Sequence, residues 1–309
     1  SLVEHLGTGR QYNINSKRGN LQILFSRDRA ENILYKNDVA AFAENMDYIE
    51  SANCNYVIIA PAYMIYVQDY SEALESHIQS GADISLMYHA VDNAKEHYLS
   101  CNILNLNRQK GVESIEANRG TAKNRNIFMD TYIMKKELFM DLVKQARKLS
   151  SMYTLHDIVN SKCSELDVRA ISHHGYFASI TDFKSYYDAN MSLINFKTAE
   201  EVFQDEWPVY TRTNDSCPTR YFESATVKNS VVSNGCLIEG DLENSVIGRG
   251  CTIRKGAVIR NCILLPGVTV GKDAVLENQV VDKNARIIHP MEIVASPEQP
   301  GYIRRDDVV

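Results

Sequence analysis

The chain has 309 residues and a mass of 35.0 kDa, which is enough for two domains with separate cores. Hydrophobic residues make up 44% and charged residues 23%, as in ordinary soluble globular proteins, and the net charge of −6 argues against nucleic-acid partners. No apolar run is long enough for a membrane span, and no signal peptide is recognised. The seven cysteines are odd in number and form no Cys-x-x-Cys pair, which favours reduced thiols and a cytoplasmic location.

The first residues are typical of the end of a helix rather than its beginning. Ser1–Gly7 closes on a glycine suited to a helix C-terminus, but it has no capping residue in front and no initiator Met. We therefore expect an N-terminal segment of the natural protein to be missing from this chain.

Up to about residue 200, patterns typical of strands alternate with patterns typical of helices. The apolar run Val57–Ala60 predicts a parallel strand buried on both faces, and Asp69 and Gly81 are placed to begin and end a helix. Further elements expected in chain order are strands at 84–88 and 127–134, a helix around 138–146, and helix N-caps at Thr154 and Thr181. Such alternation predicts an α/β fold with a doubly wound, mostly parallel sheet.

From about residue 225 the hydrophobic spacing changes to six. Ile247, Ile253 and Ile259 are six residues apart, and a second set with the same spacing follows after a slip of one residue, namely Leu264, Val270 and Leu276. A period of six suits a left-handed parallel β-helix of hexapeptide repeats, with an antiparallel sandwich with glycine turns as the alternative. The expected domains are therefore 1–205, a linker at 206–224, and a β-helix at 225–309.

Several segments resemble one enzyme family. Tyr56–Tyr70 is similar to the family's metal-binding Leu-Ala-Gly-Asp-His-Ile-Tyr region, and Tyr176–Asn190 and the coil segments also match. With these segments the chain resembles ADP-glucose pyrophosphorylase, which transfers an adenylyl group to glucose 1-phosphate. The resemblance implies a nucleotidyltransferase-like first domain, here incomplete at its N-terminus, followed by the β-helix.

The residues that the family uses for metal binding differ in this chain. Tyr63 stands where the resemblance places the first metal-binding aspartate, and Ser179 stands where it places the second. A phenol or an alcohol is a poor substitute for a carboxylate on Mg²⁺, which prefers hard anionic oxygen ligands. We interpret Tyr63 as filling the vacated metal pocket, with a new ligand contact as the alternative.

Six further positions of the same cleft depart from the family pattern or lie beside one that does. The family's Tyr-Arg-Gly-Thr-Ala-Asp-Ala segment matches the residues from Tyr35, with Asn37 in place of glycine, and Ala117 follows Glu116 where the family has a phosphate-binding lysine. The resemblance thus defines a degenerate substrate and metal cleft with the members Tyr35, Lys36, Asn37, Asp38, Tyr63, Glu116, Ala117 and Ser179.

Losing one ligand or donor of this kind typically lowers a rate roughly 100- to 1000-fold, so we expect no catalytic residue and no metal site here. The resemblance then points to the GlgD-type subunit, a non-catalytic, regulatory subunit of glucose-1-phosphate adenylyltransferase in glycogen biosynthesis. The expected partner is a catalytic homologue in a heterotetramer, with self-association as the alternative. No cofactor is expected on this chain, since Mg²⁺ would serve the catalytic partner.

Two other functions stay open from the sequence. An active sugar-phosphate nucleotidyltransferase would need Asp38 or Asp182 to replace a lost carboxylate. A hexapeptide-repeat acyltransferase normally uses a histidine within its coils, and 231–288 contains none. Lys17-Arg18 and Arg304-Arg305 are interpreted as solvated surface, with contact to a sugar-phosphate effector as the alternative.

Overall fold

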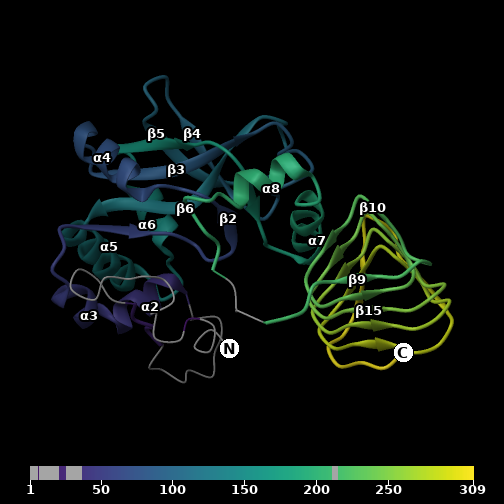
Figure 1. The fold of residues 1–309 in the computed structure, drawn as a ribbon. Helices are drawn as coiled ribbons and strands as arrows, with labels where there is room; N and C mark the ends of the chain where they lie inside the picture. The colour runs from purple at the N-terminus through teal and green to yellow at the C-terminus, as the bar shows by residue number, and fades with distance from the viewer. Residues whose placement is uncertain (1–5, 7–20, 26–36, 211–214) are drawn as a thin grey trace. The chain divides into compact units, whose positions relative to one another are not determined.

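The computed structural model describes residues 6, 21–25, 37–210 and 215–309, and its contacts divide the chain into two compact units, Ser1–Ser179 and Ile180–Val309 (Figure 1). Each unit is described by itself. The second unit includes the helices α7 (Phe183–Ser192) and α8 (Phe196–Val202), which the sequence had assigned to the first domain. The expectation for Ser1–Gly7 falls almost entirely outside the described residues.

The first unit is built on a six-stranded sheet. Its strands are β1 (Tyr56–Ile59), β3 (Ile84–Val91), β4 (Asn102–Leu106), β5 (Val112–Ala117), β6 (Arg125–Lys135) and β7 (Val168–His173). They lie in the order β5-β4-β6-β3-β7, and β1 also pairs with β6. Helices lie before and after these strands, as expected for a domain of both types, but β3, β4, β5 and β6 follow one another without a helix between them.

The direction of the strands corrects one prediction. Among the described strands of this sheet only β3 and β7 pair in parallel, whereas β6 runs antiparallel to β1, β3 and β4, so the sheet is mixed rather than mostly parallel. The hairpin β4–β5 lies between β3 and β6 in the chain and brings β6 back antiparallel, without the helical crossover that a parallel neighbour needs. The strand predicted at Val57–Ala60 is β1, which is antiparallel and only half-buried.

Alternating side chains of the central strands feed two cores, one on each face of the sheet. On one face, Leu86 and Phe128 pack with α2 (Asp38–Glu44), α5 (Lys136–Leu149) and α6 (Leu155–Lys162). On the other face, Met87 and Met129 pack with α4 (Tyr70–Ser80) and with Phe177 of β8. The short strands β2 (Met64–Tyr66) and β8 (Phe177–Ser179) pair with each other, and α3 (Met46–Ser51) follows α2.

The helix ends test the predicted caps. Asp69 accepts a hydrogen bond from the Ser71 N–H at 2.8 Å, and α4 ends at Gly81 with φ of 68°, as expected. Thr154 caps α6 as predicted. The predicted cap at Thr181 is wrong: α7 is capped by Asp182, the residue that follows it.

The coil region forms a parallel β-helix with three five-stranded sheets. Their strands are β9 (Arg220–Tyr221), β10 (Thr226–Lys228), β11 (Val231–Val232), β12 (Leu237–Ile238), β13 (Asp241–Glu243), β14 (Val246–Ile247), β15 (Thr252–Ile253), β16 (Val258–Arg260), β17 (Ile263–Leu264), β18 (Thr269–Val270), β19 (Val275–Glu277), β20 (Gln279–Val281), β21 (Arg286–Ile287), β22 (Glu292–Val294) and β23 (Gly301–Ile303). All pairings between these strands are parallel, which excludes the antiparallel sandwich.

The predicted inward positions are confirmed. Ile247, Ile253 and Ile259 are 0% exposed, and the second set, Leu264, Val270 and Leu276, is at most 1% exposed. The slip between the sets occurs at Asn261, whose φ of 50° is left-handed, and the pairing of Val258 with Val275 gives a coil of 17 residues. This coil is one residue shorter than three six-residue sides would be. The left-handed Asn makes the shorter corner possible, because its short side chain tolerates this conformation.

Candidate functional site

Tyr63 lies just after β1 and immediately before β2, at the position where the resemblance implies a metal ligand. Its side chain is 39% exposed, and its hydroxyl donates a hydrogen bond to the Asp130 carboxylate. Asp130 belongs to β6 at a register shift opposite Met87, and its φ of 44° is unusual for any residue other than glycine. The bulge thus presents a carboxylate to the phenol that follows β1.

The protonation states of this pair follow from its surroundings. Burial, and then the hydrogen bond to Asp130, raises the pKa of Tyr63 far above its ordinary value. Burial also raises the pKa of Asp130, although the hydrogen bond from Tyr63 opposes that shift. At neutral pH the phenol therefore keeps its proton and donates, so the pair carries at most the single charge of Asp130.

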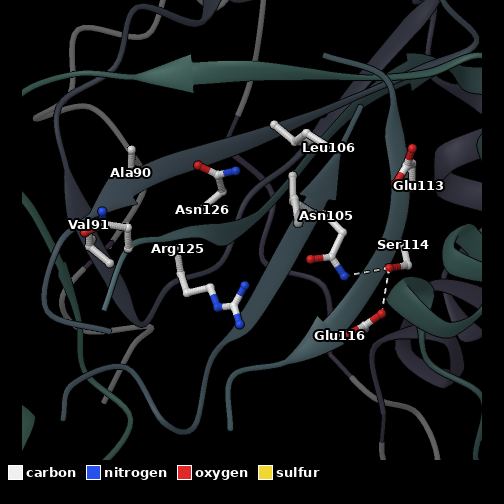
Figure 2. A pocket seen from close by; sticks show the side chains of 11 residues that line it. Ala90, Val91, Asn105, Leu106, Glu113, Ser114, Glu116, Arg125 and Asn126 are labelled. Carbon is white, nitrogen blue, oxygen red and sulfur yellow. Dashed lines mark hydrogen bonds between the residues drawn. The ribbon is translucent and has the colours of Figure 1, made fainter. Parts of the chain in front are cut away.

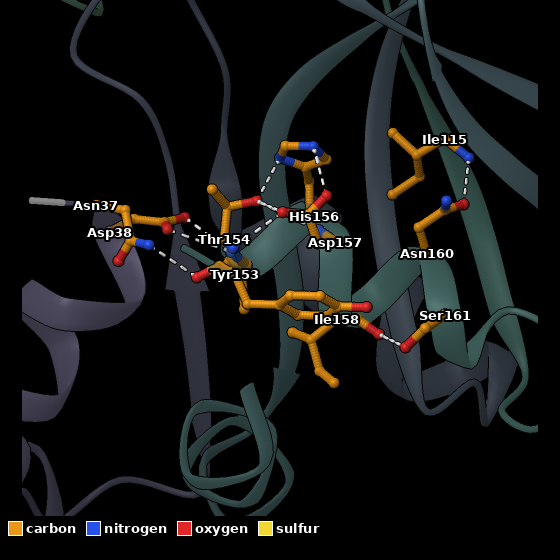
Figure 3. Close-up of polar contacts among 11 residues, drawn as sticks. Asn37, Asp38, Ile115, Tyr153, Thr154, His156, Asp157, Ile158, Asn160 and Ser161 are labelled. Carbon is orange, nitrogen blue, oxygen red and sulfur yellow. Dashed lines mark hydrogen bonds and ion pairs between the residues drawn. The ribbon is translucent and has the colours of Figure 1, made fainter. Parts of the chain in front are cut away.

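Asn37 and Asp38 lie at the start of α2 and reach across to the loop before α6 (Figure 3). The amide of Asn37 donates to the Tyr153 carbonyl at 2.9 Å, while its oxygen accepts from the Ala40 N–H at 2.8 Å. The Asp38 carboxylate accepts from the Leu155 N–H at 3.1 Å. The predicted neighbours Tyr35 and Lys36 fall outside the described residues.

The start of α6 carries a second cap of its own. Thr154 and Asp157 form a capping box, in which the Thr154 N–H donates to the Asp157 carboxylate at 3.0 Å (Figure 3). His156 lies 3.2 Å from the same carboxylate group and also contacts the Thr154 hydroxyl. Beyond burial and the hydrogen bond from Tyr63, the charges of His156 and Asp38 shift the pKa of Asp130 in opposite senses.

Ser179 is the other residue at a position of a metal-binding aspartate. It is 6% exposed, pairs with Met64 across β2 and β8, and accepts a hydrogen bond from the Cys101 thiol at 3.3 Å. Because Tyr63 precedes Met64, the two substituted positions lie next to each other, as the resemblance implies.

Glu116 and Ala117 end β5, and both are exposed. Ala117 pairs with Asn102 and offers no charge. Glu116 accepts a hydrogen bond from the Ser114 hydroxyl at 2.8 Å and lines a hollow beside β4 and β6 (Figure 2). None of the other predicted cleft residues in the described part of the chain lines that hollow.

The oxygen donors at this site do not fit Mg²⁺. Tyr63 supplies a protonated phenol that donates to one oxygen of the Asp130 carboxylate, and Ser179 contributes a neutral hydroxyl that accepts from Cys101, so neither substituted position supplies a hard anionic oxygen. Within the described residues, no three His, Cys, Asp or Glu side chains are grouped as metal ligands.

Asp38 and Asp182, the two carboxylates that could replace a lost ligand, both accept backbone hydrogen bonds at the start of a helix. Asp38 holds the Leu155 N–H, and Asp182 caps α7 by accepting from the Ser185 N–H at 2.7 Å. That backbone hydrogen bond lowers the pKa of Asp182, so its charge is used to stabilise the helix end.

Sequence reasoning missed Asp130 and Cys101, the two partners of the substituted positions. Asp130 did leave a signal, because it is the one charged residue within the apolar run 127–134. A carboxylate inside a central strand needs a partner, and here the partner is the Tyr63 hydroxyl. Cys101 left no such signal.

The fold and this site indicate the class of protein to which the chain belongs. Residues 1–195 match the nucleotidyl transferase family, and residues 218–301 match the family described as GlmU-like, C-terminal hexapeptide. The chain belongs to the nucleotidyl transferase family.

Individual proteins similar to this chain include two glucose-1-phosphate adenylyltransferases and a glycogen biosynthesis protein. The chain is 27% identical to glucose-1-phosphate adenylyltransferase of Fervidobacterium nodosum, covering 93% of this chain and 69% of that protein. It is 26% identical to the glycogen biosynthesis protein GlgD of Bacillus subtilis, covering 99% of this chain and 78% of that protein. A glucose-1-phosphate adenylyltransferase of Bacillus cytotoxicus is also 26% identical, over 100% of this chain and 81% of its own length. No described helix is long and apolar enough to cross a membrane.

Proposed function

We propose that this protein is a non-catalytic, regulatory subunit of a glucose-1-phosphate adenylyltransferase that acts in glycogen biosynthesis. The observation that carries the proposal is the hydrogen bond from Tyr63 to Asp130, in which a protonated phenol at the first substituted metal position donates to a carboxylate. The similarity to GlgD, a protein named for glycogen biosynthesis, supports the pathway. The similarity to two enzymes named glucose-1-phosphate adenylyltransferase supports a catalytic homologue as the partner.

The chemical argument rests on charge. Adenylyl transfer to a sugar phosphate depends on metal ions and cations that neutralise developing negative charge. Tyr63, Ser179 and Ala117 supply none of that charge, and Asp38 and Asp182 are used as helix caps. The natural full-length protein is therefore expected to bind no catalytic Mg²⁺ and to rely on its partner for turnover.

A regulatory subunit acts by binding more tightly to the active conformation of its partner. An activation of 5- to 150-fold corresponds to about 1–3 kcal/mol of coupling, and by linkage, ligands that favour the active partner tighten the complex by the same factor. The β-helix has open strand edges at its end coils, such as β22 and β23, which makes it a candidate contact surface for a homologous subunit in a cytoplasmic hetero-oligomer.

The test is a titration of the natural full-length protein into a catalytic homologue from the same organism, following ADP-glucose formation and particle mass together. The proposal predicts a mixed oligomer whose rate per catalytic subunit changes by at least 5-fold. A mixed oligomer with unchanged kinetics, or no mixed oligomer, would refute the regulatory role. Turnover of about 1–1000 per second by this protein alone would instead establish an active nucleotidyltransferase.

A further inference from the structure

A hollow of about 680 Å³ is lined by β4, β5, the end of β3 and the start of β6 (Figure 2), and neither Tyr63 nor Asp130 lines it. Its polar walls come from Asn105, Glu113, Ser114, Glu116, Arg125 and Asn126. The volume is in the usual range for small-molecule sites, and a few convergent polar groups are what such sites use for orientation.

Arg125 is a positive charge without a counter-ion in this hollow. Its Nη2 donates to the Thr121 hydroxyl at 2.9 Å, while its Nε is buried and has no acceptor among the described residues. No carboxylate in the described part of the chain forms an ion pair with it. A guanidinium that lines a hollow and has no ion-pair partner gains most from an anionic acceptor.

Negative charge faces this cation from β5, on the other side of β4. Figure 2 shows the Arg125 guanidinium and the Glu116 carboxylate on opposite walls, with the Asn105 amide between them. Glu113 and Glu116 are both exposed on β5. The Ser114 hydroxyl donates to Glu116 and accepts from the Asn105 amide at 2.8 Å each, which orients both side chains.

These charges restrict the ligand. A simple anion would meet Arg125 but would be repelled by Glu113 and Glu116, and a dianionic phosphate would be repelled more strongly. A simple cation would be repelled by Arg125. A small molecule that carries a carboxylate and an ammonium group satisfies both walls at once.

We propose that this hollow binds a free α-amino acid, with its carboxylate on Arg125 and its ammonium group on Glu116. The amides of Asn105 and Asn126 are left to contact its polar atoms. The planar guanidinium and a carboxylate match in two parallel hydrogen bonds, which gives the ligand a defined orientation. This inference rests on the hollow alone and stands whether or not the chain is a regulatory subunit.

Binding is measured by isothermal titration calorimetry of the natural full-length protein with glycine, alanine, serine, lysine and aspartate. Each ligand found to bind is compared with its C-terminal amide, which lacks the carboxylate, and with its N-acetyl form, which lacks the ammonium. The proposal predicts binding of at least one free amino acid, weakened at least 10-fold in either analogue. Binding of glucose or inorganic phosphate alone, equal binding of acid and amide, or no binding across the series would overturn it.

Two variants test whether Arg125 binds the carboxylate of the ligand and Glu116 its ammonium group. Arg125→Gln should abolish the difference between the free acid and its amide, whereas Glu116→Gln should abolish the difference between the free amine and its N-acetyl form. Arg169→Gln and Glu72→Gln, exposed and outside the hollow, are matched controls that should bind as the wild type does. Melting temperatures establish that each variant is folded, and Arg125→Lys replaces Arg125→Gln if the latter is not. A variant that keeps full discrimination between acid and amide without Arg125 would overturn the assignment.

Discussion

The hydrogen bond between the Tyr63 hydroxyl and the Asp130 carboxylate joins two residues that are 67 positions apart in the sequence. Asp130 adopts a left-handed backbone conformation inside a strand, which costs on the order of 1 kcal/mol for a residue with a side chain. The hydrogen bond from Tyr63 supports that conformation, because it gives the partly buried carboxylate a donor.

We expect Tyr63→Phe to lower the free energy of unfolding by about 1–3 kcal/mol, because it removes the donor and leaves the Asp130 carboxylate without its partner. Denaturant unfolding measures this loss. The double variant Tyr63→Phe with Asp130→Asn should lose less than the sum of the single variants, because a neutral amide needs the phenol less. Additive losses would mean that the two side chains do not interact.

A second residue-scale prediction concerns His89 and His173, whose Nδ1 atoms lie 3.1 Å apart. The Nε2 of His173 donates to the Val67 carbonyl, so its Nδ1 accepts from His89, and both rings are neutral. Burial lowers the pKa of His89 to about 4 and also lowers the pKa of His173.

Since the folded protein binds fewer protons than the unfolded chain, stability is complete above about pH 6.5 and falls as the pH drops towards 4. The loss due to His89 should reach roughly 1–2 kcal/mol, allowing for the screening of a half-exposed ring. Melting temperatures between pH 7 and 4 should fall more steeply for the wild type than for His89→Gln. Parallel curves would rule out this source of acid sensitivity.

At the scale of elements, the β-helix depends on a closed aliphatic interior. Ile253→Asp places an unpaired charge where the side chain is 0% exposed and should cost more than about 4 kcal/mol or prevent folding. Its neighbour Thr252 points outward on the same strand, so Thr252→Asp should cost less than about 1 kcal/mol. Thermal unfolding distinguishes the two, and a similar loss in both would contradict the observed register.

The outer edge of β5 is closed by a side chain rather than by another strand. The Ile115 N–H donates to the Asn160 side-chain oxygen of α6 at 2.7 Å (Figure 3). Asn160→Ala should cost about 1–2 kcal/mol and increase aggregation, because an unpaired edge invites pairing with other chains.

Ser161→Ala is the matched control, since the Ser161 hydroxyl bonds only within its own helix, to the Ile158 carbonyl. Light scattering during storage and denaturant unfolding provide the two measurements. Equal behaviour of the Asn160 and Ser161 variants would show that the edge is protected in another way.

The elements differ in how well the sequence predicts them. The six-residue spacing predicts which coil residues face inward, because each side of the prism repeats one local rule. The direction of β1 and β6 could not be predicted in the same way. An apolar run such as Val57–Ile59 suits either direction, and the choice depends on which distant strand it meets.

At the scale of the whole molecule, none of the seven cysteines is in a disulfide, and their exposure differs widely. Cys54 and Cys217 are exposed, whereas Cys101, Cys236, Cys251 and Cys262 are buried. Labelling of the native protein with a thiol reagent should therefore modify two cysteines rapidly, and unfolding in denaturant should expose all seven. Rapid native labelling of a coil cysteine would show that the β-helix opens.

The candidate site illustrates what a resemblance can and cannot supply. It places Tyr63 and Ser179 next to each other, and the structure brings these positions together through the pairing of β2 and β8. It does not reveal that Asp38 caps α6 or that Glu116 faces a separate hollow. Those facts depend on contacts between residues that are far apart in the sequence.

The hydrogen bond between Tyr63 and Asp130 also constrains the evolution of the chain. Returning Tyr63 to the aspartate that the family resemblance implies would set a second carboxylate against Asp130, and two carboxylates in one site repel each other. Changing Asp130 first would instead leave the Tyr63 hydroxyl without its acceptor. Each single change is therefore unfavourable while the other residue is kept. A carboxylate at position 63 is tolerated only when position 130 no longer carries one.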